Sequence, residues 1–373
     1  MAGIYIHIPF CKQACHYCDF HFSTSLKYKD ELLQALIKEI KLQKNYLDGE
    51  TVETIYFGGG TPSVLSADEI NHILDTIAGL HTISADAEIT LEANPDDLSK
   101  EKLHSLRETA VNRLSIGVQS FFDEDLMWMN RAHKAWEAES SVKRAQDTGF
   151  ENITADLIYG YPLLTDQKWK YNLDKIFELD IRHLSSYSMT VEPRTALASF
   201  IKTKKQAPID EQQSAEQFIL LMDATQAKGF EHYEISNFCK PGAYSRHNSN
   251  YWKGVKYLGI GPSAHSYNGE TRQWNVPNNP KYMAALEKSE IPAETEMLSE
   301  TNRLNEYVMI SLRTMWGLDL QTLEKISGGS ATELSKSTIE FFEKEWIVKK
   351  ENTIFLTQTG KLYADHIASS LFF

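Results

Sequence analysis

The stretch Tyr5-Ile-His-Ile-Pro-Phe-Cys11-Lys-Gln-Ala-Cys15-His-Tyr-Cys18 joins a short apolar run to three closely spaced cysteines. Residues 4–8 have the pattern of a β-strand, so the strand leads directly into the cysteine loop. Three thiolates at the spacing C-x3-C-x2-C can bind three irons of a cubic iron–sulfur cluster and leave the fourth iron open. Clusters that only carry electrons use four cysteines. An open iron can bind a small chelating ligand, which indicates chemistry at this loop.

The cysteine triad by itself also permits blander interpretations. Zinc sites usually take four Cys and His ligands, and Cys239 or His16 could complete one here. A disulfide framework is a weaker interpretation than a zinc site, because three close cysteines and one remote cysteine make poor pairs. The apolar stretch at the N-terminus is too short for an export signal, so we expect a cytoplasmic protein with reduced thiols.

Length and charge narrow the class of protein. A chain of 373 residues is long enough for two domains, or for one barrel with an appendage. No apolar run approaches the roughly 20 residues that span a bilayer, which leaves peripheral membrane contact open. The net charge of −13 argues against a general nucleic-acid surface, because phosphate binding requires a local excess of Lys and Arg.

Predicted strands and helices alternate through the N-terminal part of the chain. The strands are expected at residues 4–8, 55–57, 89–92, 113–118, 153–158 and 184–189. Repeated βα units form a parallel sheet with right-handed crossovers. Six units are too few for a closed eight-fold barrel, so we expect an α/β fold with a partial, TIM-like (β/α)6 barrel. Chemistry in such folds occurs at the carboxyl ends of the strands.

Informative residues fall at those carboxyl ends. Cys11 follows the first predicted strand, and the run Gly58-Gly-Gly-Thr-Pro62 follows the second. Glu92 ends the third strand, Gln119 follows the fourth, and Asp156 lies near the end of the fifth. Glycines allow a ligand to approach the backbone closely. The pattern therefore predicts one shared site.

The pattern changes near residue 235, so we expect a core domain over residues 1–235 and a C-terminal domain over residues 236–373. Residues 239–275 are dense in Gly, Pro, Ser, Asn and aromatic residues and are predicted to form loops. A helix over about 302–315, further helices, a hairpin over 346–356 and a terminal helix together look like a winged-helix module. The acidic balance of the chain favours a structural or lid role for it over DNA binding.

Several segments resemble a known superfamily, that of the radical S-adenosylmethionine (SAM) proteins. Residues 5–11, 113–121, 130–131 and 156–160 resemble its oxygen-independent coproporphyrinogen III oxidase group. The match is best with the haem-chaperone branch of that group, the HemW type. The resemblance implies a [4Fe-4S] cluster on Cys11, Cys15 and Cys18, with SAM on the fourth iron. It also implies a set of residues around SAM and the cluster, with Tyr17 near the adenine: Tyr5, Tyr17, Gly59, Gly60, Thr61, Glu92, Gln119, Arg131, Asp156 and Ile158.

The run His247-Asn248-Ser-Asn-Tyr251-Trp252 resembles the H-N-x-x-Y-W signature of the haem chaperones. A neutral imidazole is a common axial ligand of haem iron, and Tyr251 and Trp252 could stack on a porphyrin face. The resemblance thus implies haem binding at His247, Asn248, Tyr251 and Trp252. The alternative is a loop histidine whose aromatic neighbours fix the loop to the barrel mouth. Cys239 fits no cluster pattern and is expected to be a structural thiol.

Two functions follow from the resemblance. The first is a haem chaperone that delivers haem to client haemoproteins without ordinary turnover. The second is a coproporphyrinogen III dehydrogenase that uses a SAM-derived radical. The oxidases carry a longer N-terminal arm and a further cysteine two residues after the triad, where this chain has Phe20. These differences favour the chaperone. Three alternatives stay open at this point: whether the protein forms a homodimer, whether SAM is cleaved, and which proteins receive haem.

Overall fold

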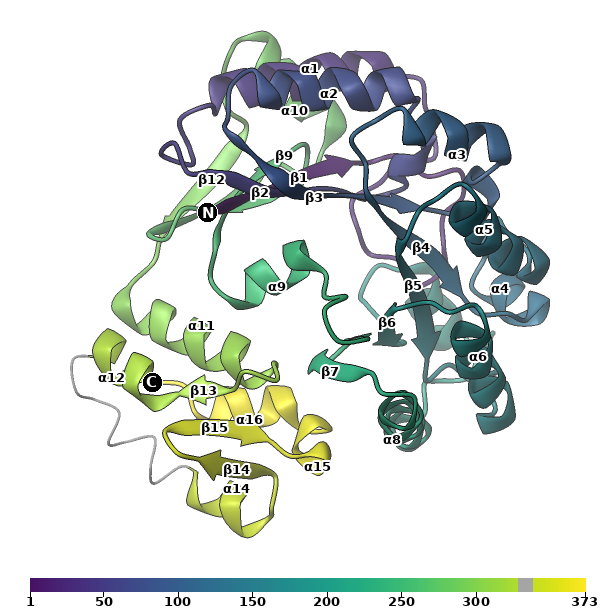
Figure 1. The fold of residues 1–373 in the computed structure, drawn as a ribbon, viewed down its shortest axis with the longest axis vertical. Helices are drawn as coiled ribbons and strands as arrows, with labels where there is room; N and C mark the ends of the chain where they lie inside the picture. Colours follow the sequence, from purple (N-terminus) through teal and green to yellow (C-terminus); the bar gives the residue numbers. More distant parts are fainter. Residues whose placement is uncertain (328–337) are drawn as a thin grey trace.

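The main body of the molecule is one twisted sheet with helices on its outer face (Figure 1). The structure, a computed structural model, describes residues 1–327 and 338–373. Six strands lie side by side and parallel in the order of the chain. They are β1 (Ala2–Ile8), β2 (Val52–Gly59), β3 (Ile83–Ala93), β4 (Arg113–Gln119), β5 (Asn152–Tyr159) and β6 (His183–Ser188). The six predicted strands and the partial barrel are confirmed.

Helices connect these strands and cover the convex side of the sheet (Figure 1). They are α1 (Lys29–Leu42), α2 (Ala67–Ala78), α3 (Lys100–Arg107), α4 (Asp123–Trp128), α5 (Ala135–Asp147) and α6 (Asp166–Glu178). In α1, the apolar residues at helical spacing are buried against the sheet, among them Leu32, Leu36 and Ile40. A capping box, whose S-x-x-E pattern is present in the sequence, begins α2: Ser66 Oγ accepts from Glu69 N at 3.2 Å, and Glu69 Oε2 accepts from Ser66 N at 2.7 Å.

Further strands extend the sheet at both edges, so that it has twelve strands within the described residues. After α7 (Ala196–Lys202) and α8 (Glu211–Ala227), β7 (Glu231–Glu234) and β8 (Asn237–Cys239) join antiparallel beside β6. β9 (Lys256–Ile260) pairs parallel with β1, and β10 (His265–Tyr267), β11 (Thr271–Asn275) and β12 (Ala293–Met297) follow antiparallel. The prediction of loops over residues 239–275 is wrong. β9 forms a strand because it pairs with β1, and the local composition does not indicate this pairing.

A buried carboxylate ties this extension to the first helix. Glu39 of α1 is fully buried and accepts from Asn275 Nδ2 at 2.7 Å and from Gly261 N at 2.8 Å. It also accepts from the hydroxyl of Tyr282, on α10 (Asn279–Glu287). Burial raises the pKa of Glu39. A buried carboxylate with this many donors holds the strands after residue 256 against the barrel.

The helix α9 (Arg246–Trp252) lies on the concave side of the sheet, inside the partial barrel (Figure 1). Glu88 of β3 accepts from the backbone N–H groups of Arg246 at 3.1 Å and His247 at 3.0 Å, through its two carboxylate oxygens. An anion at the start of a helix satisfies N–H groups that have no partner within the helix. The predicted loop of this motif is therefore a helix docked against barrel strands.

The C-terminal part has its own hydrophobic core, which runs from Leu304 to Leu371. Its elements are α11 (Glu300–Leu312), β13 (Leu318–Asp319), α12 (Leu320–Ser327), α14 (Ile339–Glu343), β14 (Ile347–Lys350), β15 (Thr353–Leu356), α15 (Gln358–Lys361) and α16 (Ala364–Ser370). The predicted hairpin is the pair β14 and β15. The first core continues to Leu286, and Ile235 packs against both cores. The domain boundary at residue 235 stays a prediction, since residues 237–297 extend the main sheet.

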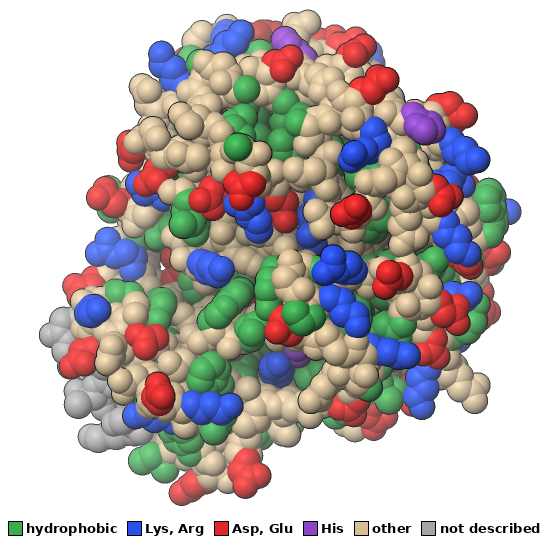
Figure 2. Space-filling view, viewed as in Figure 1, with side chains coloured by type: hydrophobic (Ala, Val, Ile, Leu, Met, Phe, Trp, Pro, Cys, Tyr) green, Lys and Arg blue, Asp and Glu red, His purple; other side chains and the backbone are tan. Residues whose placement is uncertain are grey.

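Two surface properties agree with the composition. Within the described residues, no helix is long and apolar enough to cross a membrane. Acidic and basic side chains are interspersed over the face drawn in Figure 2. A broad basic surface of the kind that binds nucleic acid is not seen on this face.

Candidate cluster and cofactor site

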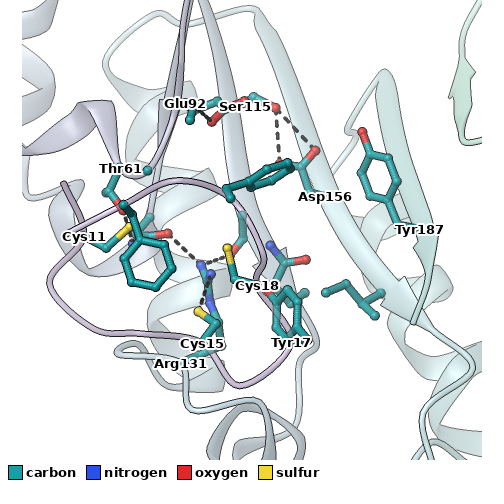
Figure 3. Close-up of a pocket in the computed structure, with 18 of the residues that line it drawn as sticks. Cys11, Cys15, Tyr17, Cys18, Thr61, Glu92, Ser115, Arg131, Asp156 and Tyr187 are labelled. Carbon is teal, nitrogen blue, oxygen red and sulfur yellow. Dashed lines mark hydrogen bonds between the residues drawn. The ribbon is translucent and has the colours of Figure 1, made fainter. Parts of the chain in front are cut away.

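A cavity of about 420 Å³ lies at the carboxyl ends of the parallel strands, and the three cysteines line it (Figure 3). The cysteine loop follows β1 and is held by backbone hydrogen bonds. Cys11 N donates to Ser23 O at 3.0 Å, and Thr61 N donates to Phe10 O at 2.7 Å. These bonds bring the cysteine loop against the glycine loop that follows β2. All three thiols are half-buried at the cavity wall.

The glycine loop needs glycine because of the chain's own packing. Gly59 has φ of +103°, and a Cβ at this position would lie 2.5 Å from His7 Cε1. A Cβ at Gly60 would lie 2.7 Å from the carbonyl oxygens of Ile8 and Phe10. These glycines were expected to allow a ligand to approach the backbone closely. The structure adds that they also allow the cysteine loop to pack on β2.

A half-buried arginine lies among the thiols (Figure 3). Arg131 Nη1 donates to Cys15 Sγ at 3.4 Å, and Nη2 donates to Asn94 Oδ1 at 2.6 Å and to Gly117 O at 3.0 Å. Burial raises the pKa of Cys11, and it raises the pKa of Cys18 to about 12. Metal binding requires thiolates, so a bound metal would displace these protons.

Two half-buried carboxyl groups lie in the same cavity, on β3 and β5. Glu92 Oε1 accepts from Tyr56 Oη at 2.8 Å, and its Oε2 accepts from Gly59 N at 3.2 Å. Asp156 accepts from Ser115 Oγ at 3.3 Å (Figure 3). Burial raises the pKa of each carboxyl to about 7, and the charge of Glu92 adds to the rise at Asp156. A cationic ligand would hold both groups in the ionised form.

Most of the residues predicted to contact SAM line this cavity. They are Tyr17, Gly59, Gly60, Thr61, Glu92, Gln119, Arg131, Asp156 and Ile158. Tyr5 is not among the lining residues and lies behind them. Its ring stacks on Tyr56 with 6.1 Å between centroids, and its hydroxyl lies 3.2 Å from His7 Nδ1. Tyr5 thus supports Tyr56, which bonds Glu92 directly.

The residues predicted to bind haem lie in different surroundings in the structure. Asn248 lines the first cavity, whereas His247 is only 2% exposed. His247 Nδ1 is 2.8 Å from Thr54 Oγ1, and its Nε2 is 3.0 Å from Tyr251 Oη. Trp252, at the other end of α9, lies 5.5 Å from the Arg313 guanidinium. Haem ligation by His247 stays a prediction, and it would require one of its two hydrogen bonds to break.

Sequence reasoning missed several residues of the cavity. They include Asn94, Ser115, Ser185, Tyr187 and Met189. Ser115 lies within the mostly apolar β4 and Ser185 within the buried but mostly polar β6, and these two strands are the neighbours of β5. Polar residues within buried strands were the available signal, and they stand beside Asp156. Tyr187 and Met189 give no such signal, because aromatic and apolar residues are ordinary at a strand end.

The donor set fits an iron–sulfur cluster that contacts a small ligand. Three thiols face one cavity, and the Arg131 cation beside them can balance thiolate charge. The cavity extends past the thiols to the carboxyls of Glu92 and Asp156, which leaves room for a ligand with a cationic group. Among the described residues, no three Cys, His, Asp or Glu side chains converge closely enough to hold a single metal ion. Of the zinc ligands considered, His16 bonds the carbonyl of Trp128 through Nδ1, at 2.9 Å.

Comparison with known proteins first defines the class. Residues 5–176 match the model of the radical SAM superfamily. The solved structure of coproporphyrinogen III oxidase (HemN) from Escherichia coli, described as a radical SAM enzyme, superposes with a TM-score of 0.86. It is 24% identical in sequence, and the match covers 99% of this chain and 89% of that one. The fold is therefore the radical SAM fold with a HemN-type C-terminal part.

Sequence relatives then identify the family. The heme chaperone HemW of Bacillus subtilis is 36% identical over 98% of both chains. HemW of Mycobacterium tuberculosis is 33% identical over 99% of this chain and 94% of its own length. HemW of Escherichia coli is 38% identical over 70% of this chain and 69% of its own. This chain belongs to the HemW family.

Proposed function

We propose that this protein is a haem chaperone that binds haem and delivers it to client haemoproteins. Membership of the HemW family over the full length of the chain carries this proposal. The first cavity supports it, because it joins three thiols, a cation and two carboxyls at one edge of the sheet. A chaperone must bind haem before it can release it to a client protein, so haem binding is the property to measure first.

The first cavity would hold a [4Fe-4S] cluster on Cys11, Cys15 and Cys18, with SAM beside it. Glu92 would face the ammonium group of SAM, and Tyr17 would lie by its adenine. When bound, the cluster supplies one-electron chemistry to SAM. The role of this chain's own residues is to bind and orient these groups and to exclude water from them.

The haem site is proposed at the α9 motif, with His247 Nε2 as the axial ligand and Asn248, Tyr251 and Trp252 around it. The hydroxyl of Tyr251 is hydrogen-bonded to Nε2 in this structure. Ligation therefore requires that this contact opens. An opening of α9 would also disturb the stacking of His247 on Tyr56, whose hydroxyl bonds Glu92 in the first cavity.

A haem titration of the anaerobically reconstituted chain, followed by its Soret band, tests the proposal. Saturable binding is expected, and it should weaken about tenfold or more in His247→Gln, which can replace hydrogen bonds but not the imidazole. Tyr251→Phe frees Nε2 and should bind haem at least as tightly as the native chain. His104→Ala changes an exposed histidine of α3 and is the matched control.

Two results would contradict the proposal in different ways. Equal binding by the native chain and His247→Gln would remove His247 as the ligand while keeping the chaperone. Absence of saturable binding, together with catalytic formation of protoporphyrinogen from coproporphyrinogen with SAM and a strong reductant, would replace the chaperone with the dehydrogenase.

A further inference from the structure

A second cavity, of about 790 Å³, lies between the barrel and the C-terminal part. Its volume falls within the range of about 300–1,000 Å³ that small-molecule sites occupy. Its walls come from the ends of β5 and β6, from α7 and α8, and from α15 and α16. Ser188, Met189 and Thr190 line both cavities, so the two sites are neighbours on either side of the segment after β6.

The lining of the second cavity combines apolar and charged side chains. Its apolar and aromatic residues are Tyr159, Met189, Val191, Ile201, Pro208, Ile209, Ala215, Phe218, Ile235, Leu362, Tyr363 and Ala364. The charged side chains in its wall are Arg313, Lys361, Glu211 and Asp365, and His366 also lines it. The apolar side chains suit a ligand with a broad apolar body, and the charge that such a ligand can carry depends on how the two cations are balanced.

The two basic residues differ in how their charge is balanced. Arg313 Nη2 lies 3.5 Å from Glu234 Oε1, and Nη1 pairs with Asp365. Lys361 Nζ instead lies 2.9 Å from His232 Nδ1. Within the described residues, no carboxylate oxygen lies within 4.0 Å of Lys361 Nζ.

The imidazole beside Lys361 is neutral and gives it no charge balance. His232 Nε2 is 3.0 Å from the carbonyl oxygen of Ile235, so this nitrogen carries the proton and Nδ1 accepts from Lys361. Burial lowers the pKa of His232 to about 3 and that of Lys361 to about 8. A half-buried ammonium without a carboxylate partner, at the wall of a cavity with many apolar side chains, is suited to a carboxylate brought by a ligand.

We propose that the second cavity binds the body of a tetrapyrrole, with Lys361 paired to one of its carboxylates. The tetrapyrrole assignment rests on the proposed function, whereas the site for an apolar carboxylate rests on the cavity and Lys361 alone. The α9 motif connects the two cavities, because Asn248 lines the first and Trp252 stacks on Arg313 of the second. A ligand in the second cavity thus contacts a wall that the proposed haem motif supports.

Metal-free protoporphyrin IX tests this site without any contribution from iron ligation. Titration of the full reconstituted chain, followed by porphyrin fluorescence, compares protoporphyrin IX with its dimethyl ester. Lys361→Gln should weaken protoporphyrin IX binding about tenfold and leave the ester unchanged. Val191→Trp, which fills the cavity from its rim, should weaken both. Lys349→Gln, at an exposed position of β14, is the matched control. Thermal melts of all variants confirm that they are folded.

The outcomes separate this site from the proposed function. If the native chain binds haem but Lys361→Gln and Val191→Trp both bind protoporphyrin IX normally, the second cavity is not the site and the chaperone remains. If the native chain binds neither haem nor protoporphyrin IX, both proposals fail. Oleate is the further probe: Lys361-dependent binding of oleate without binding of protoporphyrin IX would overturn the tetrapyrrole assignment and show an aliphatic acid site.

Discussion

The two cavities of this molecule are encoded in the sequence in different ways. The first is lined by side chains at the carboxyl ends of neighbouring strands, most of them within short runs that already look functional in the sequence. The second gathers residues from 159 to 366 that form no motif. The comparison shows that chemistry can be read from local runs, whereas a cavity lined by scattered residues depends on how distant elements pack.

The largest expected effect is at the cysteines and separates the cavities most clearly. Cys15→Ala removes one of three proposed iron ligands, so the reconstituted protein should lose most of its iron and sulfide. Protoporphyrin IX binding in the second cavity should change by less than about twofold. Metal analysis and the porphyrin titration measure the two effects. Cys239→Ala, at a buried thiol of β8, is the control that should retain the cluster. Retention of full iron in Cys15→Ala would contradict the assigned ligand set.

The next effect concerns the wall between the cysteine loop and β2. Gly59→Ala places a methyl group 2.5 Å from His7 Cε1 at a φ of +103°, and should destabilise the protein by about 3 kcal/mol. Gly49→Ala is the matched control, because its φ is +72° and nothing lies within 4 Å of the added Cβ. Its loss should be about 1 kcal/mol. Urea unfolding measures both, and equal losses would show that backbone conformation alone requires glycine at the first cavity.

A smaller effect concerns pH and the half-buried carboxyl Glu92. Its pKa is raised to about 7 in the fold, against 4.5 normally, so the folded state retains a proton that the unfolded state loses. Stability therefore falls as the pH rises from about 4.5 to about 7 and stays reduced above that. Glu92→Gln removes this loss and should be more stable than the native chain by about 2 kcal/mol at pH 8, with a difference near zero at pH 4.

Denaturation of the cluster-free protein across pH measures the Glu92 effect, with the exposed Glu216→Gln as control. The same variant should bind SAM about tenfold more weakly, because the carboxylate for its ammonium is lost. A Glu92→Gln protein whose stability follows the native pH profile would show that another group carries the titration.

The smallest effect is expected in the second cavity, at Lys361. Its pKa is lowered to about 8 in the fold, against 10.5 normally, so the charged form is disfavoured by folding. The contribution of Lys361 to the free energy of unfolding should therefore rise as the pH goes from about 8 to about 10.5. Lys361→Gln should stabilise the ligand-free protein by about 1 kcal/mol at pH 7, after discounting for partial exposure. Thermal melts in the absence of porphyrin measure this, with Lys349→Gln as control. A destabilised Lys361→Gln would show that its bond to His232 outweighs the burial of charge.

The accuracy of the sequence predictions follows the same division. The six parallel strands and the capping box of α2 were predictable, because period, caps and turns are local. Strands β9 to β12 were not, since β9 becomes ordered by pairing with β1 at the far end of the chain. The cavity residues Ser115 and Ser185 were overlooked although they are polar positions in buried strands. His247 was expected in a loop, whereas Glu88 begins a helix there by accepting its backbone N–H.

The sequence by itself determined the radical SAM class and the cysteine triad, together with the edge of the sheet on which the site lies. The class came from the resemblance of its motifs, and the edge of the sheet could be predicted because parallel strands bring their carboxyl ends to one edge, whatever the details of packing. Only the tertiary structure decided that His247 is enclosed, through a contact with Thr54 that spans 193 positions in the chain. It also decided that Lys361 meets a neutral histidine 129 positions away, at the wall of a second cavity. Burial and charge balance at these residues arise from contacts between distant segments, which no local pattern contains.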